Sequence, residues 1–243
     1  MSSKQRFVMA VFLAQALACG GTSVGPGELW ERVLRAKGGR ERLRAVHSLA
    51  IYMQPAPVVL AGPPTNWLCV FPNRYFQYVA RGMGDGPSAT VVDAASGRVA
   101  TDVNGMPRRV FQMSGAEQDR LTLNQIVYLL ETGWLHPEPV SANGNELTVE
   151  AGGRTFRLHL NNAPLPVRVY SPSLPGRKPK VSYDYHLSHY RDYEGVQLPT
   201  RVTLVSHVAW TWDVDYEVDA RYNPAVFART PDLAAGPEPW RQQ

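Results

Sequence analysis

The sequence lacks the short motifs that mark most catalytic and nucleotide-binding sites. Its 243 residues contain no G-x-S-x-G nucleophile elbow, no glycine-rich loop followed by GK[ST] and no HExxH zinc helix. Charged residues make up only 19% of the chain, and no run of lysine and arginine is dense enough to attract nucleic acid. We therefore predict no catalytic residues, no metal ion, no cofactor and no nucleic-acid partner.

Apolar runs long enough to cross a bilayer are also missing. The apolar stretch from Phe7 to Leu17 follows Lys4 and Arg6 and ends among the small residues Ala16 to Ala18. A membrane-spanning helix needs about 20 apolar residues, so this stretch is too short, and its layout is that of a secretory signal peptide. We predict that residues 1–18 are removed and that the mature chain is exported.

Cysteine is nearly absent, with only Cys19 and Cys69 in the chain. Cys19 directly follows the predicted cleavage site, and Ala16 to Gly20 resembles a bacterial lipobox, in which the cysteine becomes a lipid anchor. That resemblance implies an outer-membrane lipoprotein facing the periplasm, with residues 19–27 as a tether. The alternative is ordinary cleavage, which leaves a free Cys19 and a soluble periplasmic protein. If Cys19 is lipidated, Cys69 has no partner and is a small buried hydrophobe on a strand; a Cys19–Cys69 disulfide is the alternative.

The stretch from Val196 to Asn223 alternates apolar even positions with polar odd positions. A period of two predicts β-structure with one buried and one wet face, as in an antiparallel sheet. The run is too long for one strand, so we expect it to bend at residues 206–209. Because the apolar parity is the same on both sides, a three-residue turn or a bulged, curved strand fits better than a two-residue hairpin.

The even-numbered face of this stretch is the candidate binding surface. Its bulky side chains form either a core beneath helices or a hydrophobic cavity that takes an apolar ligand. The residues proposed to line that cavity are Val202, Leu204, Trp210, Trp212, Val214 and Tyr216.

The rest of the chain predicts an α+β protein in which a strongly curved antiparallel sheet is covered by helices. Helical periodicity covers residues 28–37, and a capping box opens a central helix over residues 114–132 between two groups of strands. We expect that helix to cover the inner face of the sheet. Residues 28–227 form a single domain, and the Pro-, Gly- and Ala-rich residues 228–243 read as a loose tail.

Polar clusters offer a weaker hypothesis of hydrolase activity. Asp213, Asp215, Glu217 and Asp219 share one strand face, a spacing that could bind a cation or support acid–base chemistry. Such a row is more commonly a solvated face balanced by arginines. His186 and His189 are three residues apart, which on a strand places them on opposite faces.

Four features together resemble the LolA/LolB-like superfamily of bacterial periplasmic and outer-membrane proteins. They are the helix and first strand in residues 28–49, the central capped helix, residues 191–201, and the closing strand in residues 212–223 with Pro224 and Phe227. The resemblance implies an unclosed β-barrel whose hydrophobic concavity is covered by helices. It also implies a non-enzymatic protein whose partner is a lipid or a lipoprotein acyl chain. The alternative is an accessory scaffold that binds an envelope protein partner and has no ligand cavity.

Overall fold

The computed structural model describes residues 24–58, 60–80, 86–114, 126–128, 137–171, 182–206 and 208–241. The predicted signal peptide (residues 1–18), Cys19 and most of the predicted helix at 114–132 lie outside these residues.

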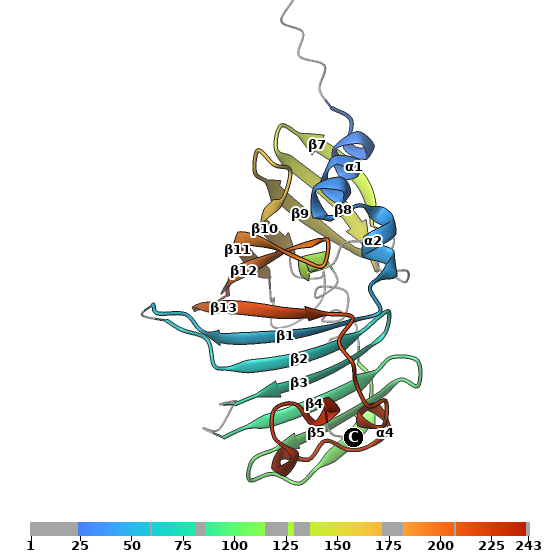
Figure 1. The fold of residues 1–243 in the computed structure, drawn as a ribbon, viewed down its shortest axis with the longest axis vertical. Coiled ribbons are helices and arrows are strands. Elements are labelled where there is room, and N and C mark those ends of the chain that lie inside the picture. The colour runs from blue at the N-terminus through green and yellow to red at the C-terminus, as the bar shows by residue number, and fades with distance from the viewer. Residues whose placement is uncertain are drawn as a thin grey trace, which may run out of the picture.

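The described chain is built around one antiparallel sheet of 13 strands (Figure 1). Their order is β6-β5-β4-β3-β2-β1-β13-β12-β11-β10-β9-β8-β7, so the two halves of the chain meet where β1 pairs with β13. The strands are β1 (Ser48–Pro55), β2 (Thr65–Val70), β3 (Arg74–Val79), β4 (Ser88–Asp93), β5 (Arg98–Val103), β6 (Arg109–Gln112), β7 (Glu138–Asn143), β8 (Glu146–Ala151), β9 (Arg154–Leu160), β10 (Pro166–Ser171), β11 (Tyr183–Tyr193), β12 (Val196–Val205) and β13 (Ala209–Val218).

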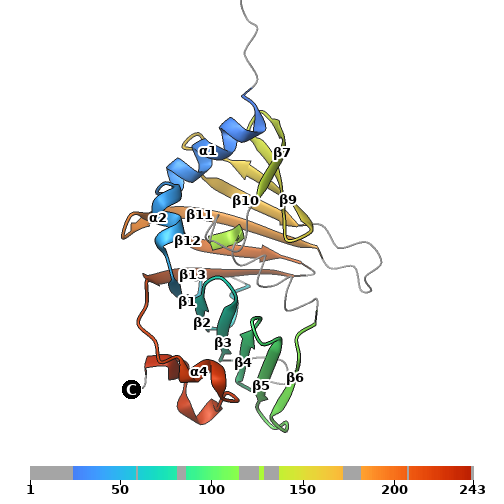
Figure 2. The same ribbon diagram turned by 90° about the vertical axis from the view of Figure 1, so that its right-hand side faces the viewer.

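The sheet is open, as predicted, but the strong curvature that we expected is not observed. Its edge strands β6 and β7 lie at opposite ends of the molecule, and the strands twist from one end to the other without curling into a barrel (Figures 1 and 2). Twist accumulates between neighbouring strands of any such sheet, whereas closure also requires the two edges to meet. The sequence also did not predict β7, because Pro137 and Pro139 are atypical of a strand and are tolerated here at a sheet edge.

The hairpin between β12 and β13 contains a three-residue turn, one of the two alternatives predicted from parity. Val205 pairs with Ala209, Leu204 with Trp210 and Val202 with Trp212. The even-numbered residues of both strands therefore lie on the same face of the sheet.

One face of the sheet is covered by N-terminal and central helical segments. The first helix, α1 (Pro26–Lys37), begins with proline at its first turn and buries Leu29, Trp30, Val33 and Leu34 on one side. Gly38 and Gly39 end α1 with positive φ angles and lead into α2 (Arg40–Ala45). The helical residues Ile126 to Tyr128 are buried in the same core cluster, which agrees with a covering role for the central segment.

The opposite face is covered by the C-terminal segment, whose described part is residues 219–241. This segment contains the short helix α4 (Ala225–Ala228) and the 3₁₀ turns η1 (Leu233–Ala235) and η2 (Pro239–Arg241), and it lies over β3 to β5 (Figure 1). Phe227 and Trp240 are buried against Leu68 and Phe76 of the sheet.

The predicted loose tail is therefore wrong for residues 228–241. Trp240 is 1% exposed, and its ring meets the ring of Phe76 edge-on at 5.3 Å. Burial of large aromatic side chains offsets the entropy lost on ordering a Pro- and Gly-rich segment.

None of the helices in the described part of the chain is long and apolar enough to cross a membrane.

Candidate functional site

The six residues proposed to line a cavity come together on the helix-covered face of β12 and β13. Val202, Trp212, Val214 and Tyr216 are buried, and Leu204 is half-buried. Trp210, at the hairpin end of the row, is 37% exposed. The row is therefore buried at its centre and exposed at its hairpin end. This gradient fits either a packed core or a channel that a ligand enters from the hairpin end.

The buried end of the row is an aromatic cluster. The ring of Tyr216 meets Tyr193 edge-on at 5.1 Å and Tyr128 at 6.0 Å. The Tyr216 hydroxyl donates to the Pro199 carbonyl oxygen at 2.6 Å, which satisfies its buried polar end. Burial raises the pKa of Tyr216 well above its usual value, so this hydroxyl stays neutral.

Lys37 is an unexpected charged group beside this cluster. Its side chain is 1% exposed, and Nζ donates to the backbone oxygens of Tyr128 at 3.0 Å and Gln197 at 2.5 Å. Nζ also lies 5.5 Å from the centre of the Tyr190 ring. Burial lowers the pKa of Lys37 from 10.5 to about 7. One side chain thus links α1 to the central helical segment and to β12.

The Pro-rich segment at residues 55–64 closes over Trp212. The Trp212 indole N–H donates to the Pro63 carbonyl oxygen at 2.9 Å. Ala61 forms a parallel bridge with Thr211, and the Gly62 amide donates to the Thr211 oxygen at 3.1 Å. This irregular connection is therefore fixed to β13 by its backbone.

Substitution of Gly62, which lies against the Trp212 ring, tests this arrangement. A Cβ added at Gly62 would lie 1.9 Å from the indole ring, so Gly62→Ala should move either the ring or the segment. We expect a loss of about 1–3 kcal/mol in the free energy of unfolding, measured by urea denaturation. The matched control is Gly27→Ala in the first turn of α1, where an added Cβ would have no atom within 4 Å outside its own helix backbone. This substitution should not lower the free energy of unfolding. Equal stability of the two variants would contradict the proposed packing.

An exposed apolar rim adjoins the open end of the row. We use "rim" for Val58 and Leu60 of the Pro-rich segment together with Val208 and Trp210 of the hairpin, which are 37 to 47% exposed. The Thr211 amide donates to the Leu60 oxygen at 3.2 Å, which places the two segments side by side. Sequence reasoning found Trp210 but missed Val58 and Leu60, because only the chain's return to Thr211 brings them next to the hairpin.

The carboxylate row on the opposite face of β13 forms ordinary polar contacts. Arg201 binds Asp213, as the solvated-face interpretation predicts, and the Tyr193 hydroxyl donates to Asp215 at 2.9 Å. The remaining partners are Arg241 and Tyr52 for Glu217, and Arg42 and the His47 amide for Asp219. These contacts favour a structural role for the row over hydrolysis. In the described residues, no three His, Cys, Asp or Glu side chains are grouped to hold a metal ion.

The structure also places His186 and Cys69 in structural roles. His186 lies 3.4 Å from Asp184, which Arg168 binds through two hydrogen bonds of 2.7 Å. The Arg168 guanidinium holds the pKa of Asp184 below its usual value. Cys69 is a buried free thiol on β2, as predicted for a small hydrophobe, and burial raises its pKa to about 12.

In sequence, no known protein family and no curated protein matches the chain. Its three-dimensional structure does have counterparts. A LolA superfamily protein from Nitrosomonas europaea matches with a TM-score of 0.51 and 13% identity, covering 81% of this chain and 96% of that chain. The fold is LolA-like. A DUF1329 family protein from Desulfovibrio piger has a TM-score of 0.48 and 12% identity, covering 83% of this chain and 96% of that chain.

The LolA-like fold confirms the resemblance that the sequence predicted at the level of the fold. The match spans nearly the whole length of the Nitrosomonas protein, so it includes the sheet as a whole and not a single hairpin.

Proposed function

We propose that the mature chain is a non-enzymatic envelope lipoprotein that binds a lipid or acyl chain against the apolar face of β12 and β13. Cys19 would carry the lipid anchor and hold the protein at the outer membrane, facing the periplasm. A role in lipoprotein or lipid trafficking is consistent with the LolA-like fold.

The observation that carries this proposal is the continuity between the rim and the buried row. Trp210 of the rim pairs with Leu204, and the next pair along the same face is Trp212 with Val202. Side-chain exposure falls from 37% at Trp210 to 8% at Trp212. An apolar surface that is open at one end and buried at the other offers an entry path for an acyl chain, and each methylene group buried there contributes about 0.8 kcal/mol.

A second candidate function is an accessory scaffold for an envelope complex, in which this face is only a core. The contact between Tyr128 and Tyr216 favours it, because the central helical segment packs directly on the row. In that case partners would bind the rim, and no acyl chain would enter.

Uptake of a fluorescent fatty acid separates these two functions. Delipidated protein should bind cis-parinaric acid, and Trp210→Glu should weaken that binding at least tenfold, because a charge would block the apolar entry. Phe111→Glu on the β6 edge is the matched control, since Phe111 is 41% exposed but lies far from the rim along the sheet. It should leave binding unchanged.

Absence of uptake by the unsubstituted protein would exclude lipid binding and favour the scaffold. An equal loss in both variants would show that the effect is not specific to the rim. Mass spectrometry of the native protein tests the remaining parts of the proposal, because it would identify a lipid on Cys19 and any co-purified ligand.

A further inference from the structure

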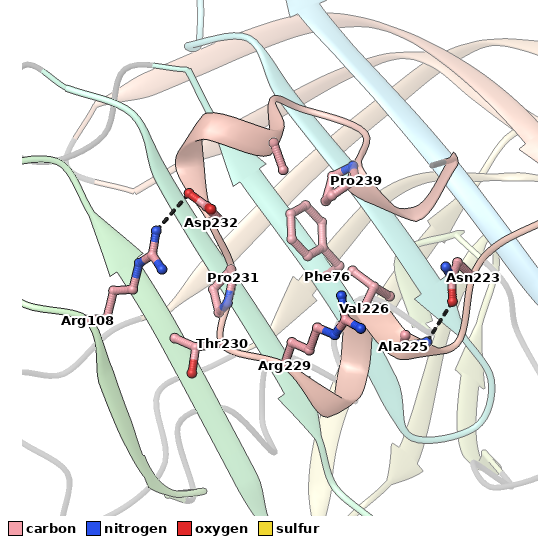
Figure 3. Close-up of a pocket in the computed structure, with 11 residues that line it drawn as sticks. Phe76, Arg108, Asn223, Ala225, Val226, Arg229, Thr230, Pro231, Asp232 and Pro239 are labelled. Atoms are coloured by element: carbon pink, nitrogen blue, oxygen red, sulfur yellow. Dashed lines mark hydrogen bonds and ion pairs between the residues drawn. The ribbon is translucent and has the colours of Figure 1, made fainter. Parts of the chain in front are cut away.

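A cavity lies between the C-terminal segment and the sheet, on the face opposite the apolar row (Figure 3). Its volume is about 420 Å³, within the range of small-molecule sites. The lining residues are Phe76, Arg108, Asn223, Ala225, Val226, Arg229, Thr230, Pro231, Asp232, Ala235 and Pro239.

The cavity has a built apolar wall. Phe76 comes from β3 and is 1% exposed, and the C-terminal segment loops around it with Val226, Pro231 and Pro239 (Figure 3). The Trp240 ring packs edge-on against the Phe76 ring.

Polar contacts with the sheet fix the segment on both sides of the cavity. Arg98 donates to the Phe227 oxygen at 2.9 Å, and the Leu233 amide donates to the Asp102 carboxylate at 3.0 Å. The cavity therefore does not depend on one flexible side chain for its shape.

Two arginines and two carboxylates surround the cavity, but they are not paired one to one. Arg108 binds Asp102 at 3.1 Å and Asp232 at 2.7 Å, so two carboxylates share this one guanidinium. Figure 3 shows the contact with Asp232. Arg229 is exposed at the cavity, and within the described part of the chain its guanidinium forms no hydrogen bond or ion pair. The four charges therefore sum to zero, but among the described residues the Arg229 guanidinium has no carboxylate partner and borders a mostly apolar space.

We propose that this cavity binds a small amphiphilic anion, with its apolar body against the half-buried Val226, Ala235 and Pro239 and its carboxylate on Arg229. A guanidinium binds a carboxylate through two parallel hydrogen bonds, and the apolar wall accounts for the rest of the ligand. This site is separate from the proposed lipid site, because Phe76 and the row belong to core clusters on opposite faces of the sheet.

Isothermal titration calorimetry with a matched pair of probes tests the proposal. The probes are 4-phenylbutyrate and 4-phenylbutanol, which share the apolar body and differ in the carboxylate. We expect the acid to bind and the alcohol to bind at least tenfold more weakly. Absence of binding of the acid at millimolar concentration would overturn the proposal.

Three variants assign any binding to this cavity. Arg229→Gln should weaken binding of the acid at least tenfold, whereas Arg221→Gln, which removes another exposed arginine outside the cavity, should not. Ala235→Phe should fill the space and abolish binding of both probes, with an unchanged melting temperature showing that the segment stays folded. Wild-type affinity in Arg229→Gln or in folded Ala235→Phe would place the ligand elsewhere and refute the assignment.

Discussion

Replacing Lys37 by methionine should flatten the pH dependence of stability around neutral pH. The folded state holds the Lys37 pKa at about 7, whereas the same group in the unfolded chain titrates near 10.5. Between these values the unfolded state binds more protons, so stability rises with pH. The contribution of Lys37 to the free energy of unfolding is therefore complete above pH 10.5 and is lost as the pH falls towards 7.

The expected size is measurable. From pH 7.0 to 8.5, Lys37 alone should raise the free energy of unfolding by about 1.5 kcal/mol, since one pKa unit corresponds to about 1.4 kcal/mol. Urea denaturation at the two pH values measures this slope. In Lys37→Met the slope should disappear. The Tyr128 and Gln197 carbonyls also lose their hydrogen-bond donor, and this loss lowers the free energy of unfolding at both pH values.

Arg35→Met is the control for this experiment. Arg35 lies in the same last turn of α1 but is exposed, so its removal should leave the slope intact. An unchanged slope in Lys37→Met would show that the Lys37 ammonium is not buried as described.

Trp240→Ala should produce the largest loss of stability. Trp240 is 1% exposed between the C-terminal segment and Phe76, and truncation of a buried tryptophan costs about 3–5 kcal/mol. For a domain of this size that corresponds to a fall in melting temperature of about 10 °C. Calorimetry or thermal denaturation followed by circular dichroism would measure it.

Trp210→Ala provides the comparison, because the same substitution is made at a side chain that is 37% exposed. It should change the free energy of unfolding by about 0.5 kcal/mol or less. If the two tryptophan variants were equally stable, the C-terminal segment would not be docked on the sheet. Under the proposed function the order reverses for ligand binding. Trp210→Ala should weaken binding and Trp240→Ala should not, because Trp210 belongs to the rim and Trp240 does not.

Local patterns in the sequence predicted much of the sheet. Alternation of apolar and polar residues in residues 196–223 identified the buried face, and unchanged parity predicted the turn in which Val205 pairs with Ala209. Amphipathic periodicity likewise placed the first helix at residues 28–37, close to the observed Pro26–Lys37. These predictions succeed because strand and helix periods are local properties of the chain.

Long-range packing explains two features that the sequence did not predict. The composition of residues 228–243 is typical of a loose tail, and only the strand order creates the apolar surface of Leu68 and Phe76 on which Trp240 docks. Lys37 lies at the end of an amphipathic helix, where nothing local indicates burial, but the approach of Tyr128 and Gln197 buries it. Trp240 is far in sequence from Leu68 and Phe76, and Lys37 is far in sequence from Tyr128 and Gln197.

The candidate site shows the same division between sequence and tertiary structure. The sequence by itself determined that Val202, Leu204, Trp210, Trp212, Val214 and Tyr216 share one face, since side chains on a strand alternate with a period of two. Only the tertiary structure decided that Val58 and Leu60 join Trp210 at an exposed rim, and that a cavity forms beside Arg229 on the opposite face. Both features depend on segments far apart in the chain meeting across the sheet, which no local period encodes.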